Sequence, residues 1–476
     1  MYKQIMHHIA QDIYPFHMPG HKRNSAFFPP NLQDLDVTEI PGMDVLSHPT
    51  GMIQELQQKI ANFYGASDSF LLVNGSSAGL VAAICATCTD GSPLIVPRNA
   101  HTSIYNGMAL SGAAPQYIMP QITPDGLAGG ISPSAFDDMP YGATALVVSP
   151  TYEGFVSDIA TIAEKVHARG GILIVDEAHG AHFAFHKAFP QSALQLGADI
   201  VVQSLHKTLP APSQCAVLHI GKTSKADISR IKFHVNALQT SSPSYILMSV
   251  CDFMLHKLWE IPKYFDEYVA RLENLRAALP CAKDDAPLRL SGMERIGTNA
   301  IFDVDISKLL FTSYTAVTGE EIAEIMAKEH KVQMEMANDR HILAMTSVAD
   351  RLEGFERLKI AVDAVIATRI TSVPVGANCV RPNANCALPE VALTPRQALA
   401  LPSQEIPWEE SAGRISAQLV ANYPPGIAII APGERIPANM PKHAEIIRVS
   451  YNNSFVGGCT NEQTPLLLSK CGAKFL

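Results

Sequence analysis

The sequence predicts an α/β fold in which a mostly parallel central sheet is covered by helices on both faces. Short apolar runs that end in turn residues alternate with stretches of helical spacing. Strands that are apolar on both sides are typical of a parallel sheet between two helical layers. The five runs that predict strands are Phe70–Val73, Leu94–Val96, Ala145–Val148, Ile172–Val175 and Ile200–Val202.

The composition excludes several classes of protein. The chain has 476 residues, of which 47% are hydrophobic and 17% charged, so a large core and about two or three domains are expected. A net charge of −9, without a basic stripe interleaved with aromatics, argues against a nucleic-acid-binding protein. No run approaches about 18 consecutive apolar residues, so no membrane span is expected, and the first residues do not resemble a signal peptide. Nine cysteines, an odd number, favour the reducing cytoplasm.

The first element is an N-terminal arm, residues 1–50. Tyr14–His21 is rich in helix-breaking residues and further prolines follow, so this segment is expected to lie across another surface. A helix is then predicted from Met52 to Tyr64, because apolar residues recur there at helical spacing and Gly65 can end it.

Two domains are predicted after the arm. Residues 51–290 contain the apolar strands and form the large domain. Residues 291–476 form a smaller α+β domain, with strands at 299–305, 332–336 and 341–345 and a helix that begins at Thr318. A segment rich in Pro, Asn and Ala, residues 373–407, is interpreted as a linker or surface crossing.

Three sites follow predicted strands, where open parallel sheets bind ligands. The first is Asn74–Gly79, in which small residues and the hydroxyls of Ser76 and Ser77 precede a helix. The amides of a helix N-terminus bind phosphate well. Taken alone, an ordinary strand-to-helix turn explains this segment equally well.

The second and third sites carry the titratable groups. Asp176 ends the Ile172–Val175 strand, and metal binding by Asp176, Glu177 and His179 is one alternative for it. An ATPase-like acidic strand end is another, although the GxxxxGK[ST] loop is absent. Lys207 follows the Ile200–Val202 strand, where it is either an ordinary exposed lysine or an amine with a lowered pKa that forms a Schiff base.

Together the three sites fit pyridoxal 5'-phosphate (PLP) and require no metal. A phosphate cradle, a carboxylate for the pyridine nitrogen and a lysine for covalent attachment are what this cofactor needs. His101, which follows the Leu94–Val96 strand, is placed to stack on the cofactor ring.

The chain resembles the PLP-dependent ornithine/lysine/arginine decarboxylases of the aspartate-aminotransferase fold, PLP fold type I, and its length is similar to their short forms. The resemblance extends to about residue 436. The matching motifs are 16–22 (FHMPGHK), 36–42, 73–79, 97–101, 149–154 (SPTYEG), 175–182 (VDEAHGAH), 204–209 (SLHKTL), 394–398, 413–417, 423–427 (YPPGI) and 431–436 (APGERI).

The resemblance implies roles for individual residues. Lys207 would be the Schiff-base lysine, Asp176 the partner of the pyridine nitrogen, and His101 the stacking ring opposite Ala178. Further cofactor-binding residues would be Ser76, Ser77, His179, Ser204 and His206. The turn 241–244 is expected to reach the phosphate of a partner subunit. The sequence departs from the family at 42–49 and from about Pro437 to the end.

The sequence thus predicts a cytoplasmic homodimer or higher homo-oligomer that decarboxylates a basic amino acid, with arginine, lysine and ornithine left open. Glu434 is the candidate acceptor for the basic end of the substrate. Two alternatives stay open: aminotransfer or β-elimination on the same fold, and a non-catalytic relative.

Overall fold

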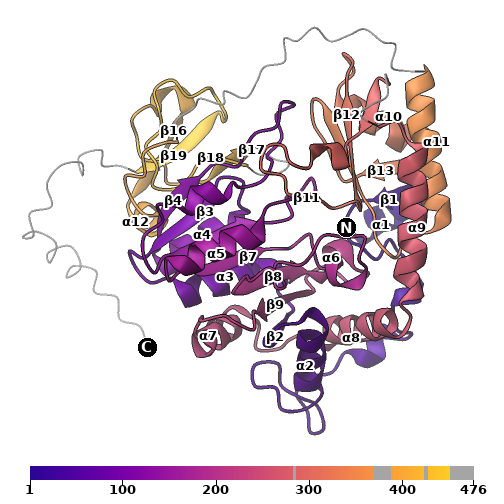
Figure 1. The fold of residues 1–476 in the computed structure, drawn as a ribbon, viewed down its shortest axis with the longest axis horizontal. Helices are drawn as coiled ribbons and strands as arrows, with labels where there is room; N and C mark the ends of the chain where they lie inside the picture. The colour runs from indigo at the N-terminus through magenta and orange to yellow at the C-terminus, as the bar shows by residue number, and fades with distance from the viewer. Residues whose placement is uncertain (282–285, 369–387, 423–426, 451–476) are drawn as a thin grey trace, which may run out of the picture.

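A seven-stranded sheet lies at the centre of this computed structural model, in the order β2-β9-β8-β7-β5-β3-β4 (Figure 1). The structure describes residues 1–281, 286–368, 388–422 and 427–450. The strands, in chain order, are β2 (Asp68–Leu72), β3 (Pro93–Pro97), β4 (Ala114–Ile118), β5 (Thr144–Val148), β7 (Ile172–Asp176), β8 (Ile200–Ser204) and β9 (Ala216–Ile220).

The predicted mostly parallel sheet is confirmed. The five neighbours from β8 to β4 are all parallel, whereas β9 runs antiparallel to both β8 and β2. The first predicted strand, Phe70–Val73, is therefore the exception, since it forms the antiparallel edge strand β2.

Helices cover both faces of the sheet because successive strand residues point to opposite sides. Leu146 packs in one apolar cluster with α3, α4 and α7, whereas Val147 packs in another with α2, α5 and α8. These helices are α2 (Met52–Tyr64), α3 (Gly75–Thr87), α4 (Thr102–Ser111), α5 (Ile159–Ala168), α7 (Ile228–Leu238) and α8 (Tyr245–Glu260). The predicted helix 52–64 is thus confirmed as α2, and Gly65 ends it with a φ of 77°.

A second sheet has the order β10-β12-β15-β14 and is antiparallel. Its strands are β10 (Leu288–Leu290), β12 (Lys308–Ser313), β14 (Met336–Ala337) and β15 (His341–Met345), and α9 (Lys263–Ala278), α10 (Gly319–His330) and α11 (Leu352–Thr368) lie beside it (Figure 1). Thr318 caps α10 in a reciprocal capping box with Glu321, at the predicted start. The predicted strand 299–305 is only β11 (Asp303–Val304), which pairs with β6 (Phe155–Val156).

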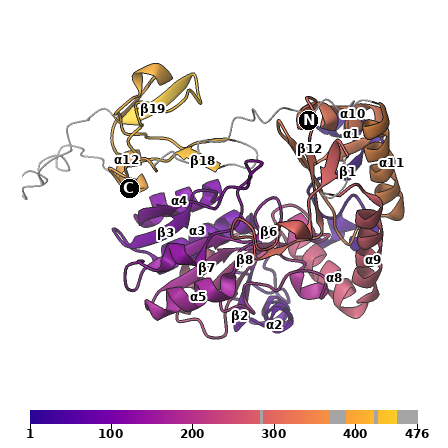
Figure 2. The same cartoon turned by 45° about the horizontal axis from the view of Figure 1, so that its top comes forward.

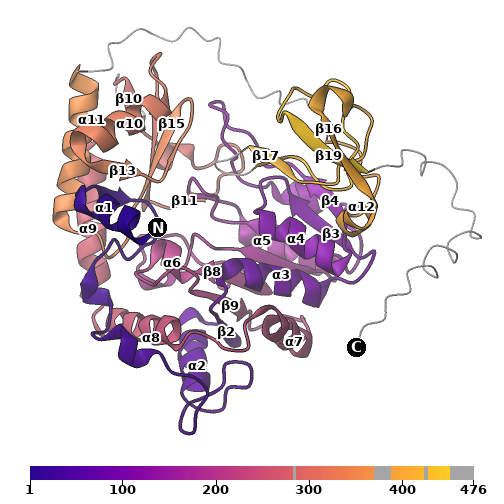
Figure 3. The same cartoon turned by 180° about the vertical axis from the view of Figure 1, so that it is seen from behind.

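The N-terminal segment has two elements that the sequence analysis did not predict. Helix α1 (Tyr2–Ala10) precedes β1 (Tyr14–Phe16), which adds a parallel strand to β13 (Val332–Met334) (Figure 3). The segment also contacts the large domain, because Gly20 donates from its backbone N–H to the carbonyl of His206 at 2.8 Å. A Cβ on Gly20 would lie 2.5 Å from the Leu209 carbonyl oxygen, so only glycine fits this approach.

A small C-terminal unit lies beside β3, β4 and α4 (Figure 2). It consists of α12 (Pro395–Ala400), β16 (Ser403–Pro407), β17 (Val420–Asn422), β18 (Ile427–Ile430) and β19 (Ile446–Ser450). The expected crossing 373–407 therefore includes folded elements from Pro395 onward, while 373–387 lies outside the described residues, as does the tail from residue 451.

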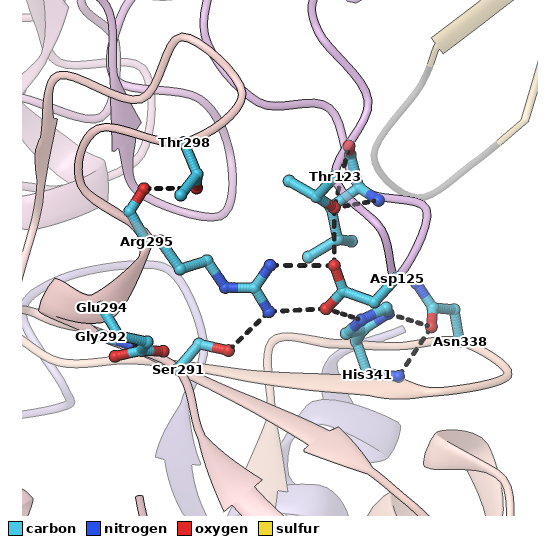
Figure 4. A network of polar contacts seen from close by, with 10 residues as sticks. Thr123, Asp125, Ser291, Gly292, Glu294, Arg295, Thr298, Asn338 and His341 are labelled. Atoms are coloured by element: carbon cyan, nitrogen blue, oxygen red, sulfur yellow. Dashed lines mark hydrogen bonds and ion pairs between the residues drawn. The ribbon is translucent and has the colours of Figure 1, made fainter. Parts of the chain in front are cut away.

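A polar network joins the loop after β4 to the second sheet and to the turn between its strands β10 and β12 (Figure 4). Asp125 accepts hydrogen bonds from both terminal nitrogens of Arg295, at 2.9 and 2.6 Å, and its Oδ2 lies 3.1 Å from Nε2 of His341. Burial acts to raise the pKa of Asp125, but these partners hold it well below its usual range. In the described part of the chain, no helix is long and apolar enough to cross a bilayer.

Candidate active site

Most of the predicted site residues converge on one cavity of about 490 Å³ at the carboxyl ends of the parallel strands. Loops that follow β2, β3, β5, β7 and β8 all contribute to it. The predicted residues that line it are Ser76, Ser77, His101, Asp176, Ala178, His179, His206 and Lys207.

The N-terminus of α3 forms one end of this cavity. Asn74 makes no side-chain capping bond there, and the Gly75 N–H donates to the Gln214 carbonyl at 2.8 Å, so the amides of the residues after Gly75 are the donors left for a ligand. Ser76 and Ser77 follow in the first turn, and Ser76 Oγ accepts a hydrogen bond of 2.7 Å from the buried hydroxyl of Ser204. Ser204 thus does not line the cavity itself, but it holds Ser76, which does, through this hydrogen bond.

Asp176 is the carboxylate at the end of β7 and is only 4% exposed. Its Oδ1 accepts from the backbone N–H of Ala178 at 3.2 Å. Burial raises the pKa of this carboxyl, whereas the nearby charges of Lys207 and His101 act to lower it. Such a carboxylate is well suited to pair with a cation inside the cavity.

Lys207 lies in the short helix α6 (Leu205–Thr208), directly after β8. Burial lowers the pKa of its amine, although Asp176 and Glu335 act in the opposite direction. Its Nζ lies 3.0 Å from Nε2 of His179, whose own pKa burial pushes well below the ordinary value. The lowered pKa makes Lys207 a better nucleophile than an exposed lysine.

Two further histidines complete the predicted set. His101 caps α4, where its Nδ1 accepts from the backbone N–H of Ser103 at 3.2 Å, and this bond fixes the orientation of the ring. Burial lowers the pKa of both His101 and His206, so both rings are neutral at pH 7. The Nδ1 of His206 lies 2.9 Å from the Cys215 carbonyl oxygen.

The structure does not bring Glu434 to the cavity. Its carboxylate is fully buried in an ion pair with Arg98, with Nη1–Oε1 and Nη2–Oε2 distances of 2.6 and 2.7 Å. Both oxygens are therefore occupied, which leaves no acceptor for a substrate. The turn 241–244 also does not line this cavity within the chain.

The alternative of a metal bound by Asp176, Glu177 and His179 is weakened, because Glu177 already has hydrogen-bond partners within the protein. Glu177 accepts hydrogen bonds from Ser192, Ala193 and Gln203 at 2.6–2.7 Å, and burial raises its pKa to about 7. Within the described ranges, no three His, Cys, Asp or Glu residues come together as a metal site.

Several cavity residues were missed as individual site candidates. Met18 and Asn99 line the cavity, as do Tyr152 and Glu153 after β5. Residues 149–154 directly follow a predicted strand, and this position could have identified Tyr152 and Glu153 as site candidates. A Cys-x-x-Cys pair, Cys85 on α3 and Cys88 at its C-cap, was also overlooked, but burial raises the pKa of both thiols, which disfavours redox chemistry.

The arrangement fits PLP. It offers the uncapped helix N-terminus and serine hydroxyls for a phosphate, a buried carboxylate for a ring nitrogen and an amine of lowered pKa for an aldehyde. The Oδ1 atom of Asn99, buried at the cavity wall, has no hydrogen-bond partner among the described residues, so the cavity presents a polar group that a ligand can satisfy.

Comparisons with known proteins agree with this chemistry. Residues 1–309 match the model of the Orn/Lys/Arg decarboxylase major domain, and residues 377–455 match the C-terminal domain of the same family. The chain is 32% identical to the uncharacterized protein YaaO of Bacillus subtilis, covering 92% of this chain and 91% of that one. It is 31% identical to an arginine decarboxylase of Bacillus anthracis, covering 92% and 90%. The constitutive lysine decarboxylase of Escherichia coli superposes with a TM-score of 0.72 at 18% identity, over 87% of this chain and 70% of that chain.

Proposed function

The chain belongs to the Orn/Lys/Arg decarboxylase family, PLP-dependent enzymes that decarboxylate basic amino acids, and we propose that its substrate is arginine. The similarity to the Bacillus anthracis arginine decarboxylase supports this choice, because it extends over 92% of the chain. The E. coli lysine decarboxylase supports the fold alone, at 18% identity.

The observation that carries the chemistry is the meeting of Lys207, Asp176 and the N-terminus of α3 at one cavity. Bound PLP supplies an electron sink for the electron pair that remains at Cα when the carboxylate leaves. Lys207 would hold the cofactor through Nζ, yield its place to the substrate amine, and carry a proton at Nζ for Cα. Asp176 would hold a proton on the ring nitrogen.

The remaining predicted residues would bind and orient the cofactor. Ser76 and Ser77, supported by Ser204, would bind the phosphate at the N-terminus of α3. His101 and Ala178 would lie on the two faces of the ring, with His179 and His206 at its rim. Their common position at the cavity supports these roles.

Aminotransfer and β-elimination are less favoured by the cavity. Both reactions retain the substrate α-carboxylate, which an arginine clamp would hold. Among the described residues that line the cavity there is no arginine. A decarboxylase gains little from binding the departing carboxylate tightly, since such binding stabilises the ground state.

The active unit would be a homodimer or larger homo-oligomer. Four apolar residues of α1 are between 43% and 72% exposed: Tyr2, Ile5, Met6 and Ile9. They follow a spacing of three and four residues, so they form one unpartnered face. A second copy of the chain is the proposed cover, and its turn 241–244 is the proposed additional phosphate contact.

The test is release of amine and carbon dioxide from arginine, lysine and ornithine, each assayed with the cofactor-loaded enzyme. We expect kcat/KM for arginine to exceed the other two by at least about tenfold. A preference for lysine or ornithine would refute the substrate assignment and leave the decarboxylase chemistry intact.

A further inference from the structure

A buried histidine lies between two lysines at the wall of the candidate active site. Nε2 of His179 is 3.0 Å from Nζ of Lys207, and its Nδ1 is 3.0 Å from Nζ of Lys308. Lys308 begins β12, so it reaches the site from the second sheet, and it is only 2% exposed. The three side chains, Lys308, His179 and Lys207, form a continuous line from that sheet to the nucleophilic amine.

The backbone at Gly154 leaves room for the side chain of Lys308. Gly154, after β5, has a φ of 97°, and a Cβ at that position would lie 2.7 Å from Cγ of Lys308. A larger residue would therefore displace the lysine side chain. Tyr152 packs edge-on against the ring of His179 with centroids 5.3 Å apart, which holds the imidazole in place.

The donors and acceptors of Lys207, His179 and Lys308 restrict which of their nitrogens can carry protons. An ammonium group only donates, and a neutral imidazole has one N–H donor and one acceptor nitrogen. Burial pushes the pKa of His179 well below its ordinary value, so the ring is neutral. A neutral ring can accept from only one of the two lysines, and the other must be an unprotonated amine that accepts from the ring N–H.

The surrounding charges favour Lys308 as the protonated member. Burial lowers its pKa to about 8 while Asp305 and Glu335 act to raise it, so it is mostly charged at pH 7. The groups that face the line are the acids Glu153, Asp176, Asp305 and Glu335 and the bases Lys22, His101 and His206. Three of the four acids, Glu153, Asp305 and Glu335, interact with Lys308, whereas two, Asp176 and Glu335, interact with Lys207.

We propose that Lys308 is a positioning residue: its ammonium group donates to Nδ1 of His179, which directs the Nε2–H of His179 at Lys207 and holds the Lys207 amine unprotonated. An unprotonated amine is the form that attacks an aldehyde. The inference deepens the proposed function and rests on Lys207 as the cofactor-binding lysine.

The first experiment measures the proton affinity of Lys207 in the full-length, cofactor-free protein. Reductive methylation modifies only unprotonated amines, and mass spectrometry reads the modification of Lys207 as a function of pH. Lys308→Met removes the charge and is expected to move the midpoint up by at least about one pH unit, a tenfold change in proton affinity. Lys308→Arg keeps a positive donor and is expected to move it by less than half as much.

Lys328→Met, on the exposed surface of α10, is the matched control and should leave the midpoint unchanged. An unchanged or lowered midpoint in a folded Lys308→Met protein would overturn the proposal. Folding is checked by near-ultraviolet circular dichroism.

A second measurement needs no substitution at Lys308. Nitrogen-15 NMR of histidine-labelled wild-type protein, assigned with the His179→Gln spectrum, distinguishes a protonated Nε2 from a protonated Nδ1. The proposal requires the proton on Nε2, and a proton on Nδ1 would overturn it. Neither readout uses substrate turnover, so failure of the arginine assignment would leave both results interpretable.

Discussion

Glu434 and Arg98 form a buried bidentate ion pair that joins the C-terminal unit to the central sheet. The guanidinium also donates to the carbonyl oxygens of Ala428 and Ile429, at 2.9 and 2.7 Å, and Glu434 accepts from the backbone N–H of Ala431 at 2.7 Å. Both charges therefore have hydrogen-bond partners, which is the condition under which a buried pair is tolerated.

Removal of one partner should be costly. Arg98→Met leaves a buried carboxylate without its cation and is expected to lower the free energy of unfolding by about 3–5 kcal/mol. Urea unfolding followed by tryptophan fluorescence measures it. Lys328→Met, which breaks an exposed pair with Glu324, is the control and should change little. The same small loss in both variants would contradict the structural role given to the buried pair.

The contact between Asp125 and Arg295 should make stability depend on acid pH. The folded-state pKa of Asp125 lies well below its value of about 3.9 in an unfolded chain. The stabilisation is therefore present above about pH 5 and is lost as the pH falls toward the folded-state pKa. Asp125→Asn should cost about 2 kcal/mol at pH 7 and progressively less below about pH 4. A difference from wild type that stays constant from pH 7 to about pH 3.5 would show that ionisation of Asp125 is not the cause.

Lys207→Ala should abolish decarboxylation while the fold is kept, because among the described residues that line the cavity Lys207 is the one that carries an amine for attaching the cofactor. The measurements are turnover and the borohydride-reducible cofactor linkage, with circular dichroism as the check on folding. Lys222→Ala, an exposed lysine of the same domain, should retain both. Near-native turnover in the purified Lys207→Ala protein would disprove the role of this lysine.

Asp176→Asn should retain the cofactor and lose at least about a hundredfold in kcat, since an amide cannot keep the ring nitrogen protonated. The rate is measured at saturating cofactor, with the bound amount read from absorbance. Glu177→Gln changes the adjacent carboxyl, which faces away from the cavity, and should keep kcat near wild type in the folded fraction. Equal rates for wild type and the loaded Asp176→Asn enzyme are the outcome that excludes this role.

The assembled enzyme should sediment at about twice the 51.4 kDa of one chain or more. The unpartnered apolar face of α1 is the physical reason, since burial stabilises by about 25 cal/mol per Å². Ile5→Asp together with Ile9→Asp should weaken the assembly, with the exposed Lys3→Asp as the control for added negative charge. A wild-type monomer that is fully active at assay concentration would refute the shared site.

The sequence by itself determined five of the seven strands of the central sheet, the strand-end position of the site and the cofactor chemistry. Runs such as Ile172–Val175 are apolar on both faces, a pattern typical of a covered strand in a parallel sheet, although Phe70–Val73 shares it and forms the antiparallel strand β2. The carboxyl ends of parallel strands lie at the same edge of a sheet. Ser76, Asp176 and Lys207 each lie at or just after such an end, so the sequence predicts that they are near each other. Local periodicity also predicted α2, and the Thr318-Gly-Glu-Glu sequence predicted the start of α10. The same signal was present in α1 at Tyr2, Ile5, Met6 and Ile9, where it was overlooked among the helix-breaking residues that follow.

Only the tertiary structure decided which distant groups share a contact. Glu434 looked free in a Pro-Gly-Glu turn, yet it is paired with Arg98, 336 residues away. Lys308 carried no sequence signal, yet β12 brings its amine to His179, and Asp125 is held by Arg295 and His341 in the same way. Such pairs depend on how the two sheets and the C-terminal unit pack. Hydrophobic periodicity reports which face of an element is buried, and the partner of a buried charge is set by that packing.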